Sequence, residues 1–353
     1  MAFRIRNTGL TERGPIPFEA VENPDPEEWQ AIADASPSAT FFHTPLWLQI
    51  FRGMDPTSRI ATRVFRFEDG ATAVFPILER KRIGGFFRSA ESTAAFCYGG
   101  WIADRELSND HAASIVRFIL KDARNLAWRI NPIDPFADLL EPYSTIQDTT
   151  EVLDLQTFVD DEDLRQHYRH SARKQINKGC RAGLATWVSD KWEEWEQYYR
   201  IYEARLQQWG QSASSSYPIA LFRAFYEARG PKVRLWVVAR DGRILGGNLN
   251  LYQSRHCVEW HAAYDCEFFA CGVRDYLVDT IIRDARANGF VHYDFNPSGG
   301  HEGSRRFKQT FGTHSLPSNL IIVRRGLYRM ESGRRLMRRL LDIKKRRSDS
   351  SRD

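Results

Sequence analysis

The 353-residue sequence contains few cysteines and no long apolar run. Its five cysteines form no CxxC pair, which argues against a disulfide framework and a zinc site, so we expect reduced structural thiols and no metal. Without a stretch of about 18 apolar residues, no transmembrane helix is expected. The first residues also lack the apolar core of a secretory signal. These absences predict a cytoplasmic protein.

Positive charge gathers at the C-terminal end, where basic residues outnumber acidic ones. The formal net charge is +5, yet residues 324–353 carry twelve Lys or Arg and four Asp or Glu, which leaves the rest at −3. This tail also holds an apolar set: Leu336, Met337, Leu340, Leu341 and Ile343. The pattern predicts peripheral contact with an anionic membrane, at the inner face, or contact with tRNA. A solubilising, partly disordered end is the alternative.

Helical and strand patterns recur in a similar order in two halves of the chain. In the first half they fall at 26–34, from 45 onward, and at 60–67, 71–78, 96–102, 110–126 and 152–155. In the second half they fall at 164–183, 185–188, 191–209, 218–229, 233–239, 244–252, 258–263, 272–288, 291–295 and 320–323. We predict an α/β (α+β) protein with domains at 1–158 and 159–325 and a basic tail at 326–353. Each domain should contain a mixed, mainly antiparallel sheet flanked by helices.

Several strings of the second half stand in a characteristic order. They are HYRHSARKQINKGCRAGLA, RLWVVARDGRILGGNLNL, HAAYDCEFFACGVRDYLVDTIIRDARANGFVHYDFNPSGG and SRRFKQTFG, and the first half adds FFHTPLWLQIF. Together they resemble the GNAT-like acyltransferases of the FemABX kind. The resemblance implies tandem GNAT-like domains and the transfer of an acyl or aminoacyl group to an amine. The chain departs from the pattern in two places, because it lacks a coiled-coil arm and a complete Q/R-x-x-G-x-G/A loop.

The resemblance leaves the carrier of the acyl group open. It implies aminoacyl-tRNA or an acyl thioester such as acyl-CoA, bound as a co-substrate and not as a tight cofactor. The missing loop favours tRNA, whereas the missing arm favours a thioester. The acceptor would be a small-molecule, peptide or glycan-linked amine in cell-envelope, polysaccharide or natural-product biosynthesis. The alternative is a non-catalytic GNAT-scaffold subunit of an envelope polysaccharide assembly system.

The segment RRFKQTFG resembles the F-K-x-x-F-G motif of the family. By that resemblance Lys308 contacts the acyl donor and stabilises developing negative charge, while Phe307 and Phe311 pack inward. Asp294 ends a predicted strand and is a candidate to accept the proton of the attacking amine. The alternative for Lys308 is a surface lysine on an amphipathic turn, and the alternative for Asp294 is a satisfied polar group of the core.

A second group of residues is expected to bind the donor. Gly272, Val273 and Arg274 open a helix after a strand, and the free N–H groups of a helix start attract phosphate. Asn296 follows a strand and is a candidate to position an amide of the carrier. An ordinary helix start explains the same glycine without a ligand.

A third group of residues is expected to bind the acceptor. Glu259 and His261 lie two apart on a strand, so we expect them to share a face as alternative bases. The resemblance adds Tyr264, and it places Arg205 beside the acceptor cleft, where a guanidinium binds phosphate or carboxylate through its planar fork. Core polar groups and a solvated helix arginine are the alternatives.

A basic row precedes the second domain. Arg165, Arg169 and Arg173 are spaced by four, Lys174 adjoins them, and residues 165–181 contain no acid. On one helix these side chains would share a face, so the row predicts contact with phosphate or nucleic acid. A solvated helix face is the alternative.

Overall fold

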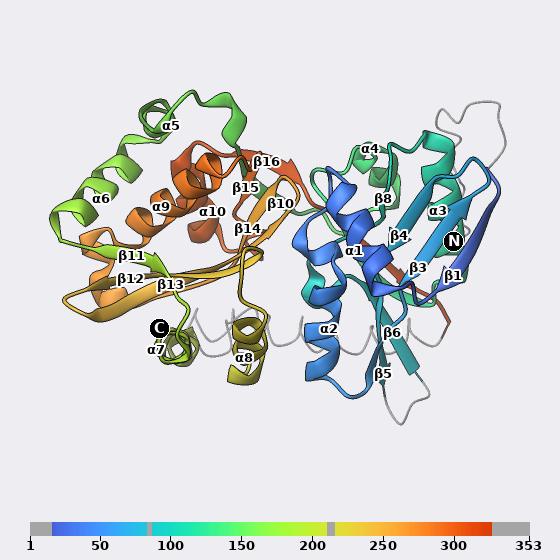
Figure 1. The fold of residues 1–353 in the computed structure, drawn as a ribbon, viewed down its shortest axis with the longest axis horizontal. Coiled ribbons are helices and arrows are strands. Elements are labelled where there is room, and N and C mark those ends of the chain that lie inside the picture. The colour runs from blue at the N-terminus through green and yellow to red at the C-terminus, as the bar shows by residue number, and fades with distance from the viewer. Residues whose placement is uncertain (1–15, 83–86, 210–215, 327–353) are drawn as a thin grey trace, which may run out of the picture.

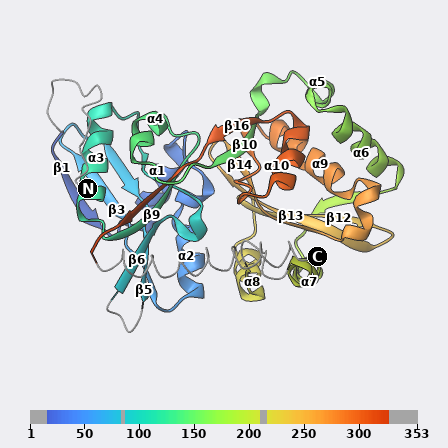
Figure 2. The same cartoon turned by 180° about the vertical axis from the view of Figure 1, so that it is seen from behind.

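The computed structural model describes residues 16–82, 87–209 and 216–326, and shows two α/β halves that lie side by side (Figures 1 and 2). The first half contains β1 (Phe18–Glu22), α1 (Pro26–Ala35), α2 (Pro45–Met54), β2 (Ser58–Ile60), β3 (Arg63–Phe67), β4 (Thr72–Phe75), β5 (Leu78–Arg82), β6 (Phe87–Ser92), β7 (Tyr98–Gly99), β8 (Ile102–Ala103), α3 (Asn109–Asp122), β9 (Asn125–Ile130) and α4 (Ala137–Leu140). In the described part of the chain, no helix has the length and apolar character needed to span a membrane.

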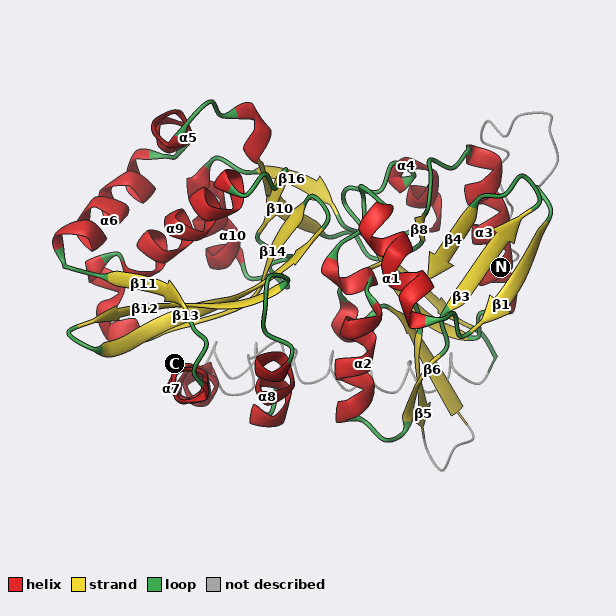
Figure 3. Ribbon diagram, viewed as in Figure 1, coloured by secondary structure: helices red, strands yellow, loops and turns green. Residues whose placement is uncertain are grey.

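The rest of the chain contains β10 (Thr149–Asp154), α5 (Asp161–His167), α6 (His170–Arg181), β11 (Ala185–Val188), α7 (Trp192–Trp209), α8 (Ile219–Glu227), β12 (Val233–Arg240), β13 (Arg243–Gln253), β14 (His256–Tyr264), α9 (Val273–Ala287), β15 (His292–Asp294), α10 (Glu302–Lys308), β16 (His314–Pro317) and β17 (Leu320–Arg324). Helices α6, α9 and α10 cover one face of the large sheet, and α7 and α8 cover the other (Figure 3).

The sheets are mixed and mainly antiparallel, as predicted. The large sheet has the order β11-β12-β13-β14-β15-β10-β16, and only β14 and β15 run parallel. The first half has the orders β1-β3-β4-β8 and β17-β9-β6-β5-β2, with β6 parallel to β9 and β7 paired with β9. Each half therefore contains a parallel pair connected by a helix, β6-α3-β9 and β14-α9-β15.

Two strands pair across the predicted boundary at residue 158. β10 precedes that boundary in sequence but lies between β15 and β16, and β17 pairs with β9 of the first half. The halves also share one apolar core, in which the Trp47 ring lies 5.9 Å from Phe225 and 5.5 Å from Trp260. The division into 1–158 and 159–325 stays a prediction.

Several predicted elements are interrupted, and two of them illustrate the causes. The helix expected at 164–183 is broken into α5 and α6, because Arg169 is extended at φ −62° and ψ 151°. The strand expected at 96–102 divides into β7 and β8. Its turn uses Gly100 at φ 108°, and a Cβ on Gly99 would lie 1.8 Å from the Ser92 carbonyl oxygen.

Candidate active site

The large sheet opens between β14 and β15. The two strands pair only from His256 to Val258 and from His292 to Asp294, after which β14 continues to Tyr264 without this neighbour. Side chains of β14, β15 and α10 meet where the pairing ends. This opening is the candidate active site.

Lys308 is the last residue of α10 and points into the protein. Its side chain is buried, with 7% of the residue exposed, and Nζ donates a 2.6 Å hydrogen bond to the carbonyl oxygen of Asn296. Burial lowers the pKa of Lys308, although the negative charges of Glu259 and Asp294 oppose the shift. No described carboxylate forms an ion pair with this lysine. The alternative of a surface lysine is therefore wrong.

Glu259 of β14 faces the same opening. Its Oε2 accepts a 2.6 Å hydrogen bond from Asn248 Nδ2 and a 3.3 Å bond from the Tyr293 hydroxyl. The Tyr264 hydroxyl in turn donates to Asn248 Oδ1. Burial raises the pKa of Glu259, and the charge of Lys308 opposes that shift. A partly buried carboxylate with a raised pKa is suited to accept a proton.

Glu259 and His261 do not share a face, which corrects the prediction. A β-bulge shifts the register, because Asn250 pairs with Glu259 whereas Leu249 pairs with His261. His261 therefore lies on the side of α7, where the Tyr198 hydroxyl bonds to Nδ1 at 2.6 Å. Burial lowers the pKa of His261 to about 3, so the imidazole is neutral.

Asp294 is a poor candidate for the base. It is fully buried and accepts hydrogen bonds from Tyr98 Oη, Thr150 Oγ1, His256 Nε2 and Asn296 N at 3.2, 2.6, 3.1 and 2.7 Å. Burial raises its pKa, but these bonds and the charge of His256 outweigh burial and leave the pKa low. Oδ1 accepts three of these bonds and Oδ2 accepts one, which favours a structural role for this carboxylate. The predicted catalytic role stays a prediction.

A cavity of about 400 Å³ adjoins the opening at the start of α9, between α6 and α10. The Arg274 guanidinium lies 3.3 Å from the centroid of the Phe307 ring, and its buried Nε has no hydrogen-bond partner among the described residues. Gln175 Oε1 is likewise buried without a partner there. Burial raises the pKa of Asp275 in the same wall to about 6. The cavity thus presents a cation, an aromatic face and unpaired polar atoms.

The predicted donor-binding residues have different environments. Gly272 adopts φ 74°, and a Cβ there would lie 2.0 Å from the Gln175 carbonyl oxygen, so only glycine lets α6 pack against the start of α9. The Val273 side chain is fully buried, which leaves only its backbone for a ligand. Asn296 presents its carbonyl to Lys308.

Arg205 lies beside the cavity wall. Its guanidinium is 5.9 Å from the Phe269 ring, the ring over which Arg274 lies at 5.6 Å. It also donates a 2.5 Å hydrogen bond to Gln208 Oε1. The structure therefore brings Arg205 towards Phe269 of the α9 cavity.

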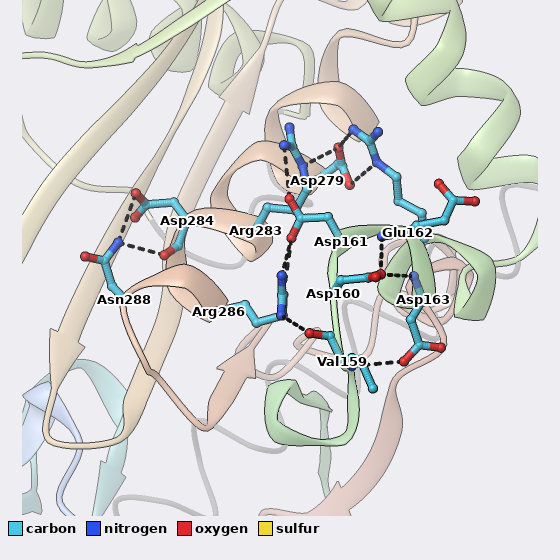
Figure 4. Close-up of polar contacts among 11 residues, drawn as sticks. Val159, Asp160, Asp161, Glu162, Asp163, Asp279, Arg283, Asp284, Arg286 and Asn288 are labelled. Carbon is cyan, nitrogen blue, oxygen red and sulfur yellow. Dashed lines mark hydrogen bonds and ion pairs between the residues drawn. The ribbon is translucent and has the colours of Figure 1, made fainter.

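The basic row is not one continuous surface, because the helix breaks before Arg169. Arg165 Nη2 contacts the buried Asp279 at 2.5 Å, which fixes its side chain between α5 and α9. Figure 4 shows the adjoining network, in which Arg283 contacts Asp279 at 3.1 Å and Arg286 contacts Asp161 at 2.7 Å.

The remaining members of the row differ in exposure. Arg169 and Lys174 are exposed, whereas Arg173 donates a 2.7 Å hydrogen bond to the Gln166 carbonyl. Only the exposed pair keeps the predicted availability for phosphate. Their role stays a prediction.

Sequence reasoning missed Glu151, which organises the Lys308 segment. Its buried carboxylate accepts hydrogen bonds from Arg305 Nε, Gln309 Nε2, Thr313 Oγ1 and Ser315 Oγ at 3.1, 3.2, 2.9 and 2.6 Å. An acid inside the apolar strand TTEVLD was the available signal. Asn248 and Tyr293, which hold Glu259, were also missed.

Comparisons with known proteins identify the fold. Residues 166–309 match the acetyltransferase (GNAT) domain family. No curated protein sequence matches the chain. The FemX crystal structure superposes with a TM-score of 0.71 at 14% identity, over 88% of this chain and 99% of FemX.

Two further structures are similar at lower scores. L-PGS from Bacillus licheniformis has a TM-score of 0.52 at 14% identity, over 90% of this chain and 96% of that one. A conserved protein from Bacteroides thetaiotaomicron has a TM-score of 0.54 at 12% identity, over 88% and 100%. The protein therefore has the GNAT fold, and it shares the fold of FemX over most of its length.

Proposed function

We propose that the protein is an N-acyltransferase that moves an aminoacyl or acyl group from an activated carrier to an amine. One observation carries the proposal: the charges of buried Lys308 and partly buried Glu259 interact where β14 and β15 separate, next to the α9 cavity. Acyl transfer to an amine requires a proton acceptor and a stabiliser of the oxyanion, and these two residues offer both.

The chemistry assigns a role to each group. The amine nitrogen attacks the acyl carbonyl carbon and loses its proton to Glu259. The ammonium of Lys308, held by the Asn296 carbonyl, stabilises the negative charge on the tetrahedral oxygen. The bond from the acyl carbon to the carrier oxygen or sulfur then breaks, and the leaving group receives a proton. No covalent intermediate on the protein is needed.

The carrier would occupy the α9 cavity. Both aminoacyl-tRNA and coenzyme A present an adenosine with phosphate, and the cavity offers Arg274 at a helix start with the Phe307 and Phe269 rings. Exposed Arg169 adjoins it, since its backbone N–H bonds to the Thr310 carbonyl. The acceptor would be a small-molecule, peptide or glycan-linked amine in cell-envelope, polysaccharide or natural-product biosynthesis.

The test uses the purified full chain with two donors in parallel, a labelled aminoacyl-tRNA pool and acetyl-CoA. Each is offered with amino sugars and amine-bearing peptidoglycan precursors, and mass spectrometry detects new amides. We expect one donor to yield an amide with the wild-type protein, and Lys308→Met to bind that donor but to transfer its acyl group about 10²-fold more slowly. If neither donor binds or reacts, the non-catalytic scaffold subunit becomes the better explanation.

A further inference from the structure

A second cavity, of about 380 Å³, lies where the two halves meet. The first half contributes residues after α1, between β8 and α3, and between β9 and α4, and the second half contributes Arg255 and His292. Its lining shares no residue with the α9 cavity, and neither Lys308 nor Glu259 belongs to it. It is a separate candidate site.

The walls of this junction cavity are held by hydrogen bonds both between the halves and within the first half. Gln253 Nε2 and Ser254 Oγ each donate to the Ala33 carbonyl at 2.9 Å, which ties the end of α1 to the β13–β14 turn. Asn131 Nδ2 donates to the Ser38 carbonyl at 2.7 Å, which ties the loop after β9 to the loop after α1. The cavity is therefore a built feature of the fold.

One side of the cavity is aromatic. The Trp101 and Phe136 rings lie 5.7 Å apart at an interplanar angle of 48°, and Trp101 is 4% exposed. Leu107 is also buried in this lining. These groups suit an apolar or aromatic side chain of a ligand.

Apart from Arg105, the acidic residues of the cavity come from one half of the molecule and the basic residues from the other. Acidic Asp134 and Glu106 come from the first half, whereas basic Arg255 and His292 come from the second. Arg105 is the exception, and it contacts its neighbour Asp104 at 3.4 Å. A ligand with opposite charges at its two ends would complement this arrangement.

Three titratable groups in the lining of the cavity lack a polar partner, wholly or in part, among the described residues. Asp134 is 7% exposed, and its Oδ1 accepts a 2.9 Å bond from Phe136 N, while Oδ2 has no partner among the described residues. Burial raises the pKa of Asp134 to about 7, which reflects the cost of an unpaired buried carboxylate. The Arg255 guanidinium and the His292 ring also form no hydrogen bond or ion pair with residues of the described ranges.

We propose that the junction cavity binds a small zwitterion of the amino acid or dipeptide class with an apolar side chain. Its ammonium pairs with Asp134, its carboxylate with Arg255, and its side chain packs on Trp101 and Phe136. The ammonium supplies the counter-charge that Asp134 lacks in the fold. This inference stands independently of the acyltransferase proposal, because it uses none of the residues assigned to transfer.

Calorimetric titration of the full chain tests the proposal, with L-phenylalanine and glycyl-L-phenylalanine as probes. We expect at least one of them to bind. The matched analogues L-phenylalaninamide and 3-phenylpropionate each lack one charge and should bind at least roughly tenfold more weakly. Asp134→Asn and Arg255→Gln should each weaken zwitterion binding to a similar degree. Lys308→Met should bind the zwitterion as the wild type does.

Asp134→Asn retains an acceptor for Phe136 N, and Arg255 is exposed, so both variants should fold, which thermal melting checks. If Asp134→Asn fails to fold, zwitterion binding by Arg255→Gln tests the proposal in its place. The proposal is overturned if neither zwitterion binds, if the single-charge analogues bind equally well, or if a folded variant binds as tightly as the wild type. Loss of binding in Lys308→Met would overturn it too, by placing the probe at the candidate active site.

Discussion

Lys308 Nζ donates a 2.6 Å hydrogen bond to the carbonyl oxygen of Asn296, a residue at φ 60° whose own N–H donates to Asp294 Oδ1 at 2.7 Å. Asp294 Oδ1 also accepts a hydrogen bond from the hydroxyl of Tyr98, which belongs to the first half. The ammonium is therefore positioned through β15 by contacts that reach both halves of the molecule.

Replacing Lys308 should separate catalysis from stability. Lys308→Met retains most of the buried side chain and should lower the rate of amide formation by about 10²-fold, roughly 2.7 kcal/mol, because one charged donor is lost. Lys308→Ala should show the same rate loss and a lower melting temperature, because it also leaves a cavity. Lys308→Arg should rescue poorly, since a planar fork does not fit a point-charge site. Normal turnover by Lys308→Met would contradict the assigned role.

Glu259 should set the acidic limb of the pH–rate profile. Only the ionised carboxylate accepts a proton, so the rate should rise with pH through its pKa, which burial raises above 4.5. Glu259→Gln should abolish this limb and lower the rate by about 10²-fold or more. Asp241→Asn, whose side chain is 93% exposed in a turn, is the control and should leave the profile unchanged.

The raised pKa of Glu259 also affects the stability of the fold. The folded state binds the Glu259 proton more tightly than the unfolded state, so this group stabilises the fold below pH 4.5, and its contribution is lost as pH rises through the raised pKa. Denaturant unfolding of wild type and Glu259→Gln across this range measures the difference. An equal pH dependence in both would show that the pKa is not raised.

Glu151 should act as a positioning residue. Glu151→Gln keeps the shape of the side chain but turns a buried carboxylate that accepts four hydrogen bonds into an amide, so we expect a loss of about 1–2 kcal/mol of unfolding free energy. Transfer should slow, because the segment that Glu151 holds carries Lys308 and also lines the donor cavity. Glu302→Gln removes an exposed ion pair with Arg306 and should cost under about 0.5 kcal/mol. Equal effects of the two variants would contradict this role.

Local signals predicted the second-half hairpin closely. The expected strands 233–239 and 244–252 correspond to Val233–Arg240 and Arg243–Gln253 around the Asp241-Gly242 turn. The first-half strand expected at 71–78 is broken between Phe75 and Leu78, where Pro76 cannot donate a backbone hydrogen bond.

The long-range strand pairings could not be predicted from the sequence. Nothing local tells that β17 pairs with β9 or that β10 inserts beside β15, since both depend on distant partners. The arrangement of the candidate active site was also hard to predict where it depends on residues distant in sequence. Lys308 was found through its motif, whereas the bulge that separates Glu259 from His261 arises from strand register and not from alternation.

The basic tail provides a prediction outside the described residues. Deleting residues 327–353 removes ten basic and four acidic residues. With about 1 kcal/mol per basic residue near an anionic surface, the full chain should bind phosphatidylserine vesicles at low salt more strongly than the truncated chain. Neutral phosphatidylcholine vesicles are the control. Binding of labelled tRNA by the full and truncated chains tests tRNA, the other predicted partner of the tail. Equal partitioning of both chains in all assays would make the tail a solubiliser.

Gly272 offers a test of how the donor cavity is built. Gly272 and Gly183 both adopt left-handed φ values, 74° and 68°, but a Cβ on Gly183 meets nothing within 4 Å. Gly183→Ala should therefore cost only the conformational penalty, about 1–2 kcal/mol. Gly272→Ala adds a Cβ that would lie 2.0 Å from the Gln175 carbonyl, so α6 must move away from α9.

We expect Gly272→Ala to lose clearly more unfolding free energy than Gly183→Ala in urea titrations. Any protein that stays folded should also bind the donor more weakly, because α6 forms one wall of the cavity and Arg274 forms another. Gly183→Ala should bind the donor normally. If both variants lose the same stability and both bind donor normally, α6 does not hold the cavity in the way that the close contact at Gly272 indicates.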